Sequence, residues 1–296
     1  MKTQFDIPEM CTAYREQLNY KIINQNQDNQ LCIIYFSSNG LYYPNTSEVF
    51  QKTILTDNRF EWEKNILPSA RKVILLRDIT KQWYWNGINT TLNSIEKVAD
   101  FLHAETTGME VTCVGSSAGG YAAVLFGYLL GASRVFAFSG QFSLKGSLTN
   151  EQIPLNPTIV KLHSMPEFSN YFELMDSVKQ GATPVFYFYP ALSEMDIEQA
   201  DFVKSFENIY PFGFALSIHG ETCYPINFLN LFSMPTNSLI ALSQHYAQKL
   251  IRPICFSMRV SGLLSTIIYV VNRKFKNIKN SRFVLFGIAG KPQSPT

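Results

Sequence analysis

Short apolar runs and amphipathic stretches alternate along the chain. Six runs of four to six residues are rich in β-branched and aromatic side chains and are bounded by turn residues, which is typical of buried β-strands. Between them lie two helical stretches: one repeats apolar residues on a single stripe, and the other is apolar almost throughout. The predicted strands are residues 31–36, 73–76, 110–114, 134–138, 184–189 and 213–218, and the helices are residues 91–102 and 119–130.

Strands that are apolar on both faces and alternate with helices predict a mostly parallel sheet covered on both sides. We therefore expect a doubly wound α/β fold, with functional residues where the strands end. Residues 141–183 are too many for a simple connection and predict a helical insertion, or lid, before the strand at 184–189. We expect a catalytic domain over residues 1–250, followed by a C-terminal extension of residues 251–296.

Composition and charge narrow this picture. With 46% hydrophobic and 16% charged residues, the chain is neither disordered nor collagen-like. The net charge of +2 hides a strong asymmetry. Nine of the 25 basic residues and none of the 23 acidic ones lie in residues 222–296, so this segment carries +9 and the rest carries −7. This separation of charge indicates that the C-terminal segment has a role that depends on its positive charge.

The sequence also predicts the compartment. The first ten residues lack the apolar core and cleavage site of a secretory signal, and the five cysteines include no CxxC pair. We therefore expect a cytoplasmic protein. The best membrane candidate, residues 260–271, has 12 residues, whereas a spanning helix needs about 20.

The strand at 110–114 runs into a G-x-S-x-G pattern, which is formed by Gly115, Ser117 and Gly119 and is followed by an apolar helix. A serine on such a tight turn takes strained backbone angles, and small neighbours prevent collisions as the strand meets the helix. The turn lifts the Ser117 hydroxyl clear of the sheet. The Ala118 amide, at the helix N-terminus, then points to where an oxyanion would form. The alternative, a dinucleotide-binding turn, requires a G-x-G-x-x-G order that is missing here.

From about residue 31 to residue 226 the chain thus resembles the α/β-hydrolase superfamily. The resemblance implies the chain order serine, acid, histidine. Among the four histidines, His219 alone directly follows a predicted strand, and we expect it to be the base; the alternative is a hydrogen-bonded histidine at a strand end. His103 closes a helix, His163 lies in the insertion, and His245 lies inside an apparent helix.

The acid is expected on the loop after the strand at 184–189, where Asp196 would hold the His219 tautomer and stabilise the imidazolium. Asp196 could instead be only the N-cap of the following helix, since aspartate is favoured there. Glu194 and Asp201 are rivals, and Asp201 is expected within that helix as a solvated charge.

Two further loops bear on the site. The backbone amide of Ser38 or Asn39 could supply the second oxyanion donor, or these residues could form an ordinary Asn-Gly turn. Trp83 and Tyr84 could form a sugar-stacking platform, although aromatics that anchor a long loop to the core are the more common arrangement. Asp78 either orders that loop through hydrogen bonds or pairs with the preceding arginine.

A serine, histidine and acid together can hydrolyse esters or transfer acyl groups. The elbow, the Arg-Asp and Trp-Tyr segment and the missing signal are loosely similar to bacterial capsular and surface polysaccharide O-acetyltransferases of this fold. That resemblance implies acetyl-CoA as co-substrate, no bound cofactor, and a hydroxyl of a carbohydrate polymer, often anionic, as acceptor. The alternatives are a cytoplasmic carboxylesterase or thioesterase, and a catalytically silent component of a polysaccharide or secretion complex.

The histidines and cysteines lack metal-ligand spacing, and we expect neither a metal site nor specific nucleic-acid binding. Residues 252–282 place an apolar run beside a basic cluster. This combination suits an interfacial helix on an anionic membrane, which would make the protein peripheral to the inner membrane. It equally suits docking to an acidic polymer or a capsule-assembly complex. The alternative is a helix that packs on the domain with a solvated basic face.

Overall fold

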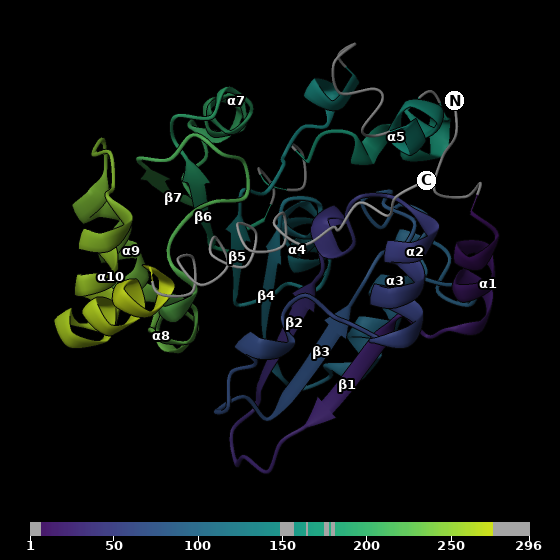
Figure 1. The fold of residues 1–296 in the computed structure, drawn as a ribbon, viewed down its shortest axis with the longest axis horizontal. Helices are drawn as coiled ribbons and strands as arrows, with labels where there is room; N and C mark the ends of the chain where they lie inside the picture. Colours follow the sequence, from purple (N-terminus) through teal and green to yellow (C-terminus); the bar gives the residue numbers. More distant parts are fainter. Residues whose placement is uncertain (1–6, 149–156, 164, 175–177, 179–180, 275–296) are drawn as a thin grey trace, which may run out of the picture.

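The computed structural model describes residues 7–148, 157–163, 165–174, 178 and 181–274. Within these residues seven strands form one sheet, in the order β1-β3-β2-β4-β5-β6-β7 (Figure 1). β1 is antiparallel to β3, and all other neighbouring pairs are parallel. The predicted mostly parallel, doubly wound α/β fold is confirmed. The strands are β1 (Tyr20–Asn24), β2 (Leu31–Phe36), β3 (Lys72–Leu76), β4 (Glu110–Ser116), β5 (Arg134–Phe138), β6 (Val185–Pro190) and β7 (Ile209–Phe214).

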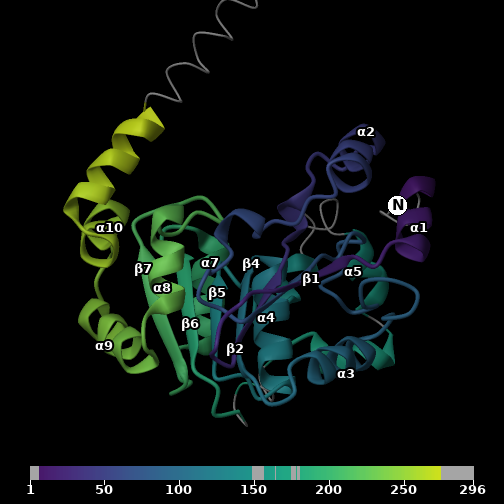
Figure 2. The same cartoon turned by 90° about the horizontal axis from the view of Figure 1, so that it is seen from below.

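Helices cover both faces of this sheet (Figure 2). In β2, Ile34 and Phe36 belong to one apolar core and Ile33 and Tyr35 to the other, because successive side chains of a strand point to opposite faces. α3, α4 and α7 contribute to the first core, and α8, α9 and α10 to the second. The helices are α1 (Pro8–Glu16), α2 (Ser47–Phe50), α3 (Ile95–Glu105), α4 (Ala118–Leu129), α5 (Pro157–Leu162), α7 (Glu194–Val203), α8 (Phe228–Ser233), α9 (Thr236–Tyr246) and α10 (Pro253–Ser261).

The strand order reverses at β2, which lies between β3 and β4. In open α/β sheets, ligands bind outside the carboxyl ends of the strands at such a reversal. The loop that begins at Ser37 follows β2, and the turn at Ser117 follows β4. The topology therefore brings both predicted oxyanion segments to the place where this kind of sheet binds ligands.

Two strands differ from the prediction. The last strand spans Ile209–Phe214 instead of residues 213–218. The sequence pattern missed its start because Pro211 lies inside it, and proline normally argues against a strand. Proline is tolerated there since β7 is an edge strand. β1 was missed because its sequence, YKIIN, is short and partly polar, which suits the opposite edge.

Between β5 and β6, the described parts of residues 141–183 contain short helices, as predicted. They contain η5 (Lys145–Leu148), α5 and η6 (Pro166–Tyr171), and an antiparallel bridge joins Ser143 to Glu173. In Figure 1, α5 lies at the edge where the parallel strands end. Residues 149–156, 164, 175–177 and 179–180 of this predicted insertion lie outside the described residues.

The predicted C-terminal extension, residues 251–296, begins inside the packed domain. Ile251 forms a parallel bridge with Phe214, and Phe256 of α10 is fully buried in the second core. After Gly262, residues 263–274 form a further helix. Among the described residues, no helix is both long enough and apolar enough to cross a membrane.

Candidate active site

Ser117 sits on a strained turn between β4 and α4, with φ 50° and ψ −120°. The turn leaves no room for side chains beside it. A Cβ on Gly115 would lie 1.9 Å from the Gly119 carbonyl oxygen, and one on Gly119 would lie 2.3 Å from the Phe36 carbonyl oxygen. The glycines of the pattern are therefore required by close packing within the turn and against the end of β2.

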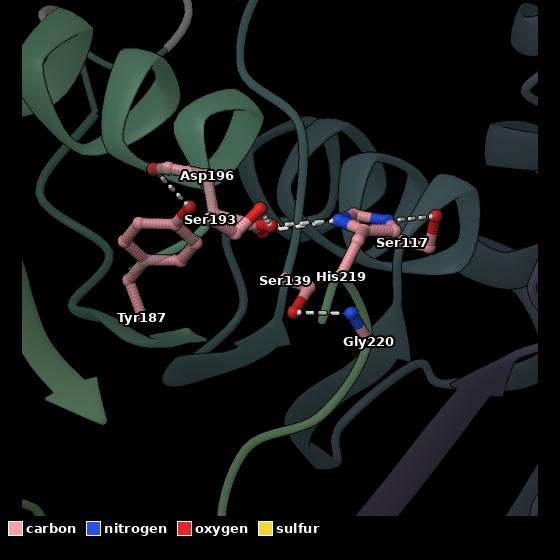
Figure 3. A network of polar contacts seen from close by, with 7 residues as sticks. All are labelled: Ser117, Ser139, Tyr187, Ser193, Asp196, His219 and Gly220. Carbon is pink, nitrogen blue, oxygen red and sulfur yellow. Dashed lines mark hydrogen bonds and ion pairs between the residues drawn. The ribbon is translucent and has the colours of Figure 1, made fainter. Parts of the chain in front are cut away.

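Three polar side chains from three strand ends form one hydrogen-bonded chain (Figure 3). Ser117 Oγ lies 2.9 Å from His219 Nε2. His219 Nδ1 lies 3.0 and 3.1 Å from the two carboxylate oxygens of Asp196. A neutral imidazole that donates from Nδ1 to the carboxylate leaves Nε2 free to accept the serine proton. The structure thus brings together the three residues singled out in the sequence, in the order that nucleophilic catalysis needs.

Asp196 lies in the first turn of α7, and its side chain is 1% exposed. The Ser193 hydroxyl donates to its Oδ2 at 2.7 Å. Ser193 occupies the N-cap position, so the alternative interpretation of Asp196 as the N-cap is wrong. Of its rivals, Asp201 is exposed and pairs with Lys204. The hydrogen bonds found among the described residues join His219 to Ser117 and Asp196 and include none to Glu194.

The loop that carries His219 is hydrogen-bonded to the end of the neighbouring strand β5. The Gly220 N–H donates to Ser139 Oγ at 3.1 Å, and Ser139 follows β5 with a positive φ of 46°. The His219 side chain remains 28% exposed, so solvent or a substrate can reach it. Sequence reasoning missed Ser139, although a polar residue directly after a buried strand was a signal for it.

The two candidates for the second oxyanion donor differ in the structure. The Ser38 N–H donates to Glu61 Oε2 at 2.5 Å, and its side chain accepts from the Gly40 N–H. Among the described residues, neither the Asn39 N–H nor the Ala118 N–H has a hydrogen-bond acceptor. Within the part of the chain that the structure describes, the Asn39 and Ala118 amides are therefore free, whereas the Ser38 amide is occupied.

Glu61, which sequence reasoning missed, holds the loop after β2. Burial raises the pKa of its carboxyl, and the hydrogen bonds from Ser38 act in the opposite direction. No sequence spacing links Glu61 to Ser38, because only the folded chain brings the Glu61 carboxylate to the Ser38 amide.

The sugar-stacking platform predicted for Trp83 and Tyr84 is not present. The two residues are only 2% and 0% exposed, so neither ring offers a face to a substrate. Trp83 Nε1 donates to Gln141, and the Tyr84 hydroxyl donates to the Ser37 carbonyl. They anchor the loop to the core, which was the alternative.

Asp78 organises that same loop. Its carboxylate accepts hydrogen bonds from the Thr80 N–H and hydroxyl and from the Gln82 and Tyr84 N–H groups, at 2.6 to 3.0 Å. No ion pair joins Asp78 to Arg77 in the described residues. Of the two alternatives, loop ordering is the one that the structure supports.

The other three histidines lie elsewhere. His103 contacts the Leu129 carbonyl, His163 the Val160 carbonyl and His245 the Arg259 guanidinium. In the part of the chain that the structure describes, no group of three or more histidine, cysteine, aspartate or glutamate side chains could hold a metal ion.

A hollow of about 500 Å³ adjoins the His219 loop. Gly220, Cys223 and Tyr224 line it on the loop side, and Tyr269 and Arg273 of the last described helix line it on the other. Its lining is mixed, and it places a guanidinium close to the loop that carries the base.

Comparisons with known proteins find similarity among solved structures. No family model and no curated protein sequence matches the chain. Among solved structures, a variant of the capsule O-acetyltransferase of Neisseria meningitidis serogroup A in complex with CoA is similar, with a TM-score of 0.48 and 12% identity over 79% of this chain and 91% of that chain. Esterase B from Lactobacillus rhamnosis gives a TM-score of 0.46 and 12% identity over 82% and 93%. MenH from S. aureus gives 0.41 and 12% over 77% and 100%. Because these scores are below 0.5, the function is inferred from the geometry of the site.

Proposed function

We propose that this chain is an acyl-transfer enzyme with Ser117 as nucleophile, His219 as base and Asp196 as orienting acid. The observation that carries the proposal is the continuous hydrogen-bonded chain from Ser117 Oγ through both imidazole nitrogens to the Asp196 carboxylate. The exposed edge of His219 leaves access for a second substrate.

In the first half-reaction, Ser117 Oγ bonds to the acyl carbon of the donor while its proton passes to His219 Nε2. Asp196 stabilises the resulting imidazolium. The free amides of Ala118 and Asn39 are the proposed donors to the oxyanion. His219 then returns the proton to the leaving group as the donor's bond to the acyl carbon breaks.

In the second half-reaction, His219 removes a proton from a hydroxyl or from water, and the oxygen attacks the acyl-enzyme. The bond between the acyl carbon and Ser117 Oγ breaks, and Oγ regains its proton from His219. Hydrolysis and transfer differ only in this acceptor.

For the finer activity, we propose O-acetyl transfer from acetyl-CoA to hydroxyls of a surface polysaccharide. Arg273 at the hollow beside Gly220, together with the +9 charge of residues 222–296, supports an anionic donor or acceptor. The experiment measures acetyl-CoA turnover with and without a panel of anionic polysaccharides, for wild type and Ser117→Ala. Acceptor-dependent turnover that Ser117→Ala abolishes supports transfer, and turnover that no acceptor accelerates excludes it for the polymers tested.

Hydrolysis is the second candidate, because the 28% exposed His219 side chain is open to water. A carboxylesterase or thioesterase would cleave simple nitrophenyl esters or thioesters without any acceptor. Labelling of Ser117 by a fluorophosphonate distinguishes both enzymes from a silent component of a polysaccharide or secretion complex. A fully folded protein that no fluorophosphonate labels contradicts the proposal of catalysis itself.

A further inference from the structure

The helix of residues 263–274 turns an apolar face away from the protein. Five large aliphatic side chains on it are between 43% and 71% exposed. At about 100° per residue, they share one arc of roughly 140°. These side chains, called the apolar face below, are Leu263, Leu264, Ile267, Ile268 and Val271.

The opposite side of the helix is fixed to the domain. Thr266 is fully buried, and its hydroxyl donates to Ser257 Oγ at 3.0 Å. The Tyr269 ring lies 5.2 Å from the Tyr224 ring, and the Arg273 guanidinium lies 5.6 Å from that same ring. These contacts fix the rotation of the helix about its axis. The apolar face is therefore held toward solvent by the packing of the opposite side. In Figure 2 this yellow end of the chain projects beyond the body of the protein.

The charged residues in the segment that carries the apolar face are all basic. Arg252, Arg259, Arg273 and Lys274 are all exposed. No acidic residue follows Glu221 anywhere in the sequence, and four more basic residues follow Lys274. An apolar strip flanked by cations is the pattern of helices that lie in the interface of anionic membranes.

We propose that the apolar face docks on the surface of an anionic lipid bilayer. Contiguous exposed apolar patches are rare on soluble monomers and mark interaction surfaces. A second copy of the chain is a poorer occupant, since a two-fold contact through this face would bring two +9 segments together. A hydrated acidic polymer would meet the cations but would not cover the aliphatic side chains.

Docking would also orient the site. The hollow beside Gly220 is lined from its other side by Tyr269 and Arg273 of this same helix. A protein bound through the apolar face therefore holds the loop that carries His219 close to the bilayer surface. The inference about docking stands on the helix alone and does not depend on catalysis.

The test uses the full chain and vesicle flotation. Vesicles of phosphatidylcholine alone are compared with vesicles containing phosphatidylglycerol, each at low and high salt. We expect flotation with the anionic vesicles, weakened by salt because the charges are screened. The variant Leu264→Ser/Ile268→Ser should lower the partition coefficient roughly tenfold or more, since it removes two of the most exposed aliphatic side chains.

The matched control is Leu18→Ser/Leu129→Ser, which removes two leucines that are 62% and 42% exposed elsewhere on the protein. It should bind vesicles like the wild type, and thermal unfolding verifies that both variants fold. Absence of flotation with anionic vesicles overturns the proposal. So does equal binding of the two variants, or a dimer in light scattering that only Leu264→Ser/Ile268→Ser dissociates.

Discussion

At the scale of single residues, Asp196 can act in the proposed reaction only through His219, and this gives a sharp test. Asp196→Asn keeps the size of the side chain but presents an amide to Nδ1, which favours the wrong tautomer. We expect kcat to fall by roughly 10³–10⁴ while the fold is retained. Asp201→Asn on the same helix is the control, because Asp201 is 64% exposed. An equal loss in both variants, measured with a nitrophenyl ester, would contradict the role of Asp196.

The free amide of Asn39 can be tested by proline. Asn39 is the first residue of a short 3₁₀ helix, and Ser38 before it is extended, with φ −81° and ψ 170°. Both conformations accept a proline at position 39. Asn39→Pro removes the N–H, and we expect kcat to fall by roughly 10²–10³. Asn39→Ala retains the N–H and should have near wild-type activity; a matching loss in Asn39→Ala would assign the effect to the side chain.

The sequence identified the residues whose positions follow from a local rule. Ser117 lies in a pentapeptide whose turn geometry requires its glycines, and His219 and Asp196 follow from the order of strands. Glu61 obeys no such rule, because only the folded chain brings it to the loop after β2. Ser139 directly follows a buried strand, but its contact with the His219 loop is formed only in the folded chain. Trp83 was predicted at a substrate surface but lies in the core. An aromatic residue after a strand can occupy either place, and the sequence pattern does not distinguish them.

At the scale of elements, strand ends were harder to predict than strands. The five inner strands β2, β3, β4, β5 and β6 are near-continuous apolar runs, and the sequence placed them within two residues of their observed bounds. The edge strands carry polar residues or proline, since one of their sides faces no partner. β7 was therefore shifted and β1 was missed.

The loop after β3 provides a test by pH. Lys81 is 6% exposed, and its ammonium donates to the Tyr42 carbonyl and to Asn45. Burial lowers the pKa of Lys81 from 10.5 to about 7, with the nearby Asp78 acting in the opposite direction. Between these two values the unfolded chain binds a proton that the folded protein does not, so stability rises with pH across this window. Below about pH 7 both states are protonated and the contribution is constant.

Lys81→Met removes this dependence. We therefore expect the free energy of unfolding of the wild type, minus that of Lys81→Met, to increase between pH 7 and pH 10 by on the order of 1–4 kcal/mol. Urea denaturation of both proteins at the two pH values measures the difference, in which other titrating groups cancel. A difference that stays constant, or falls with pH, would contradict the buried position of the ammonium.

At the scale of the whole molecule, the division of charge at Glu221 does not coincide with a division of structure. The basic segment begins directly after the His219 loop, and it supplies α8, α9 and α10 to the second core. The described part of the basic segment, residues 222–274, is thus packed with the rest of the domain into one body. The charge asymmetry therefore does not mark a domain boundary, and the apolar face lies in the basic segment.

This view predicts the outcome of two truncations. A chain that ends at Gly262 keeps Ile251 and Phe256, which are 2% and 0% exposed, and should unfold at nearly the wild-type temperature. A chain that ends at Leu250 loses both. Phe256 contacts the rings of Phe212 and Phe214 on β7, and removing a buried phenylalanine side chain costs about 3–5 kcal/mol.

The shorter chain should therefore melt many degrees lower or aggregate, and fluorophosphonate labelling of Ser117 should fall with it, since β7 leads to His219. The chain that ends at Gly262 should be labelled normally by the fluorophosphonate. It should no longer float with anionic vesicles, because it lacks the apolar face. Equal thermal stability of the two truncations would mean that residues 251–262 are an appendage. Failure of the chain that ends at Gly262 to fold would mean that the helix of residues 263–274 serves the core rather than a membrane.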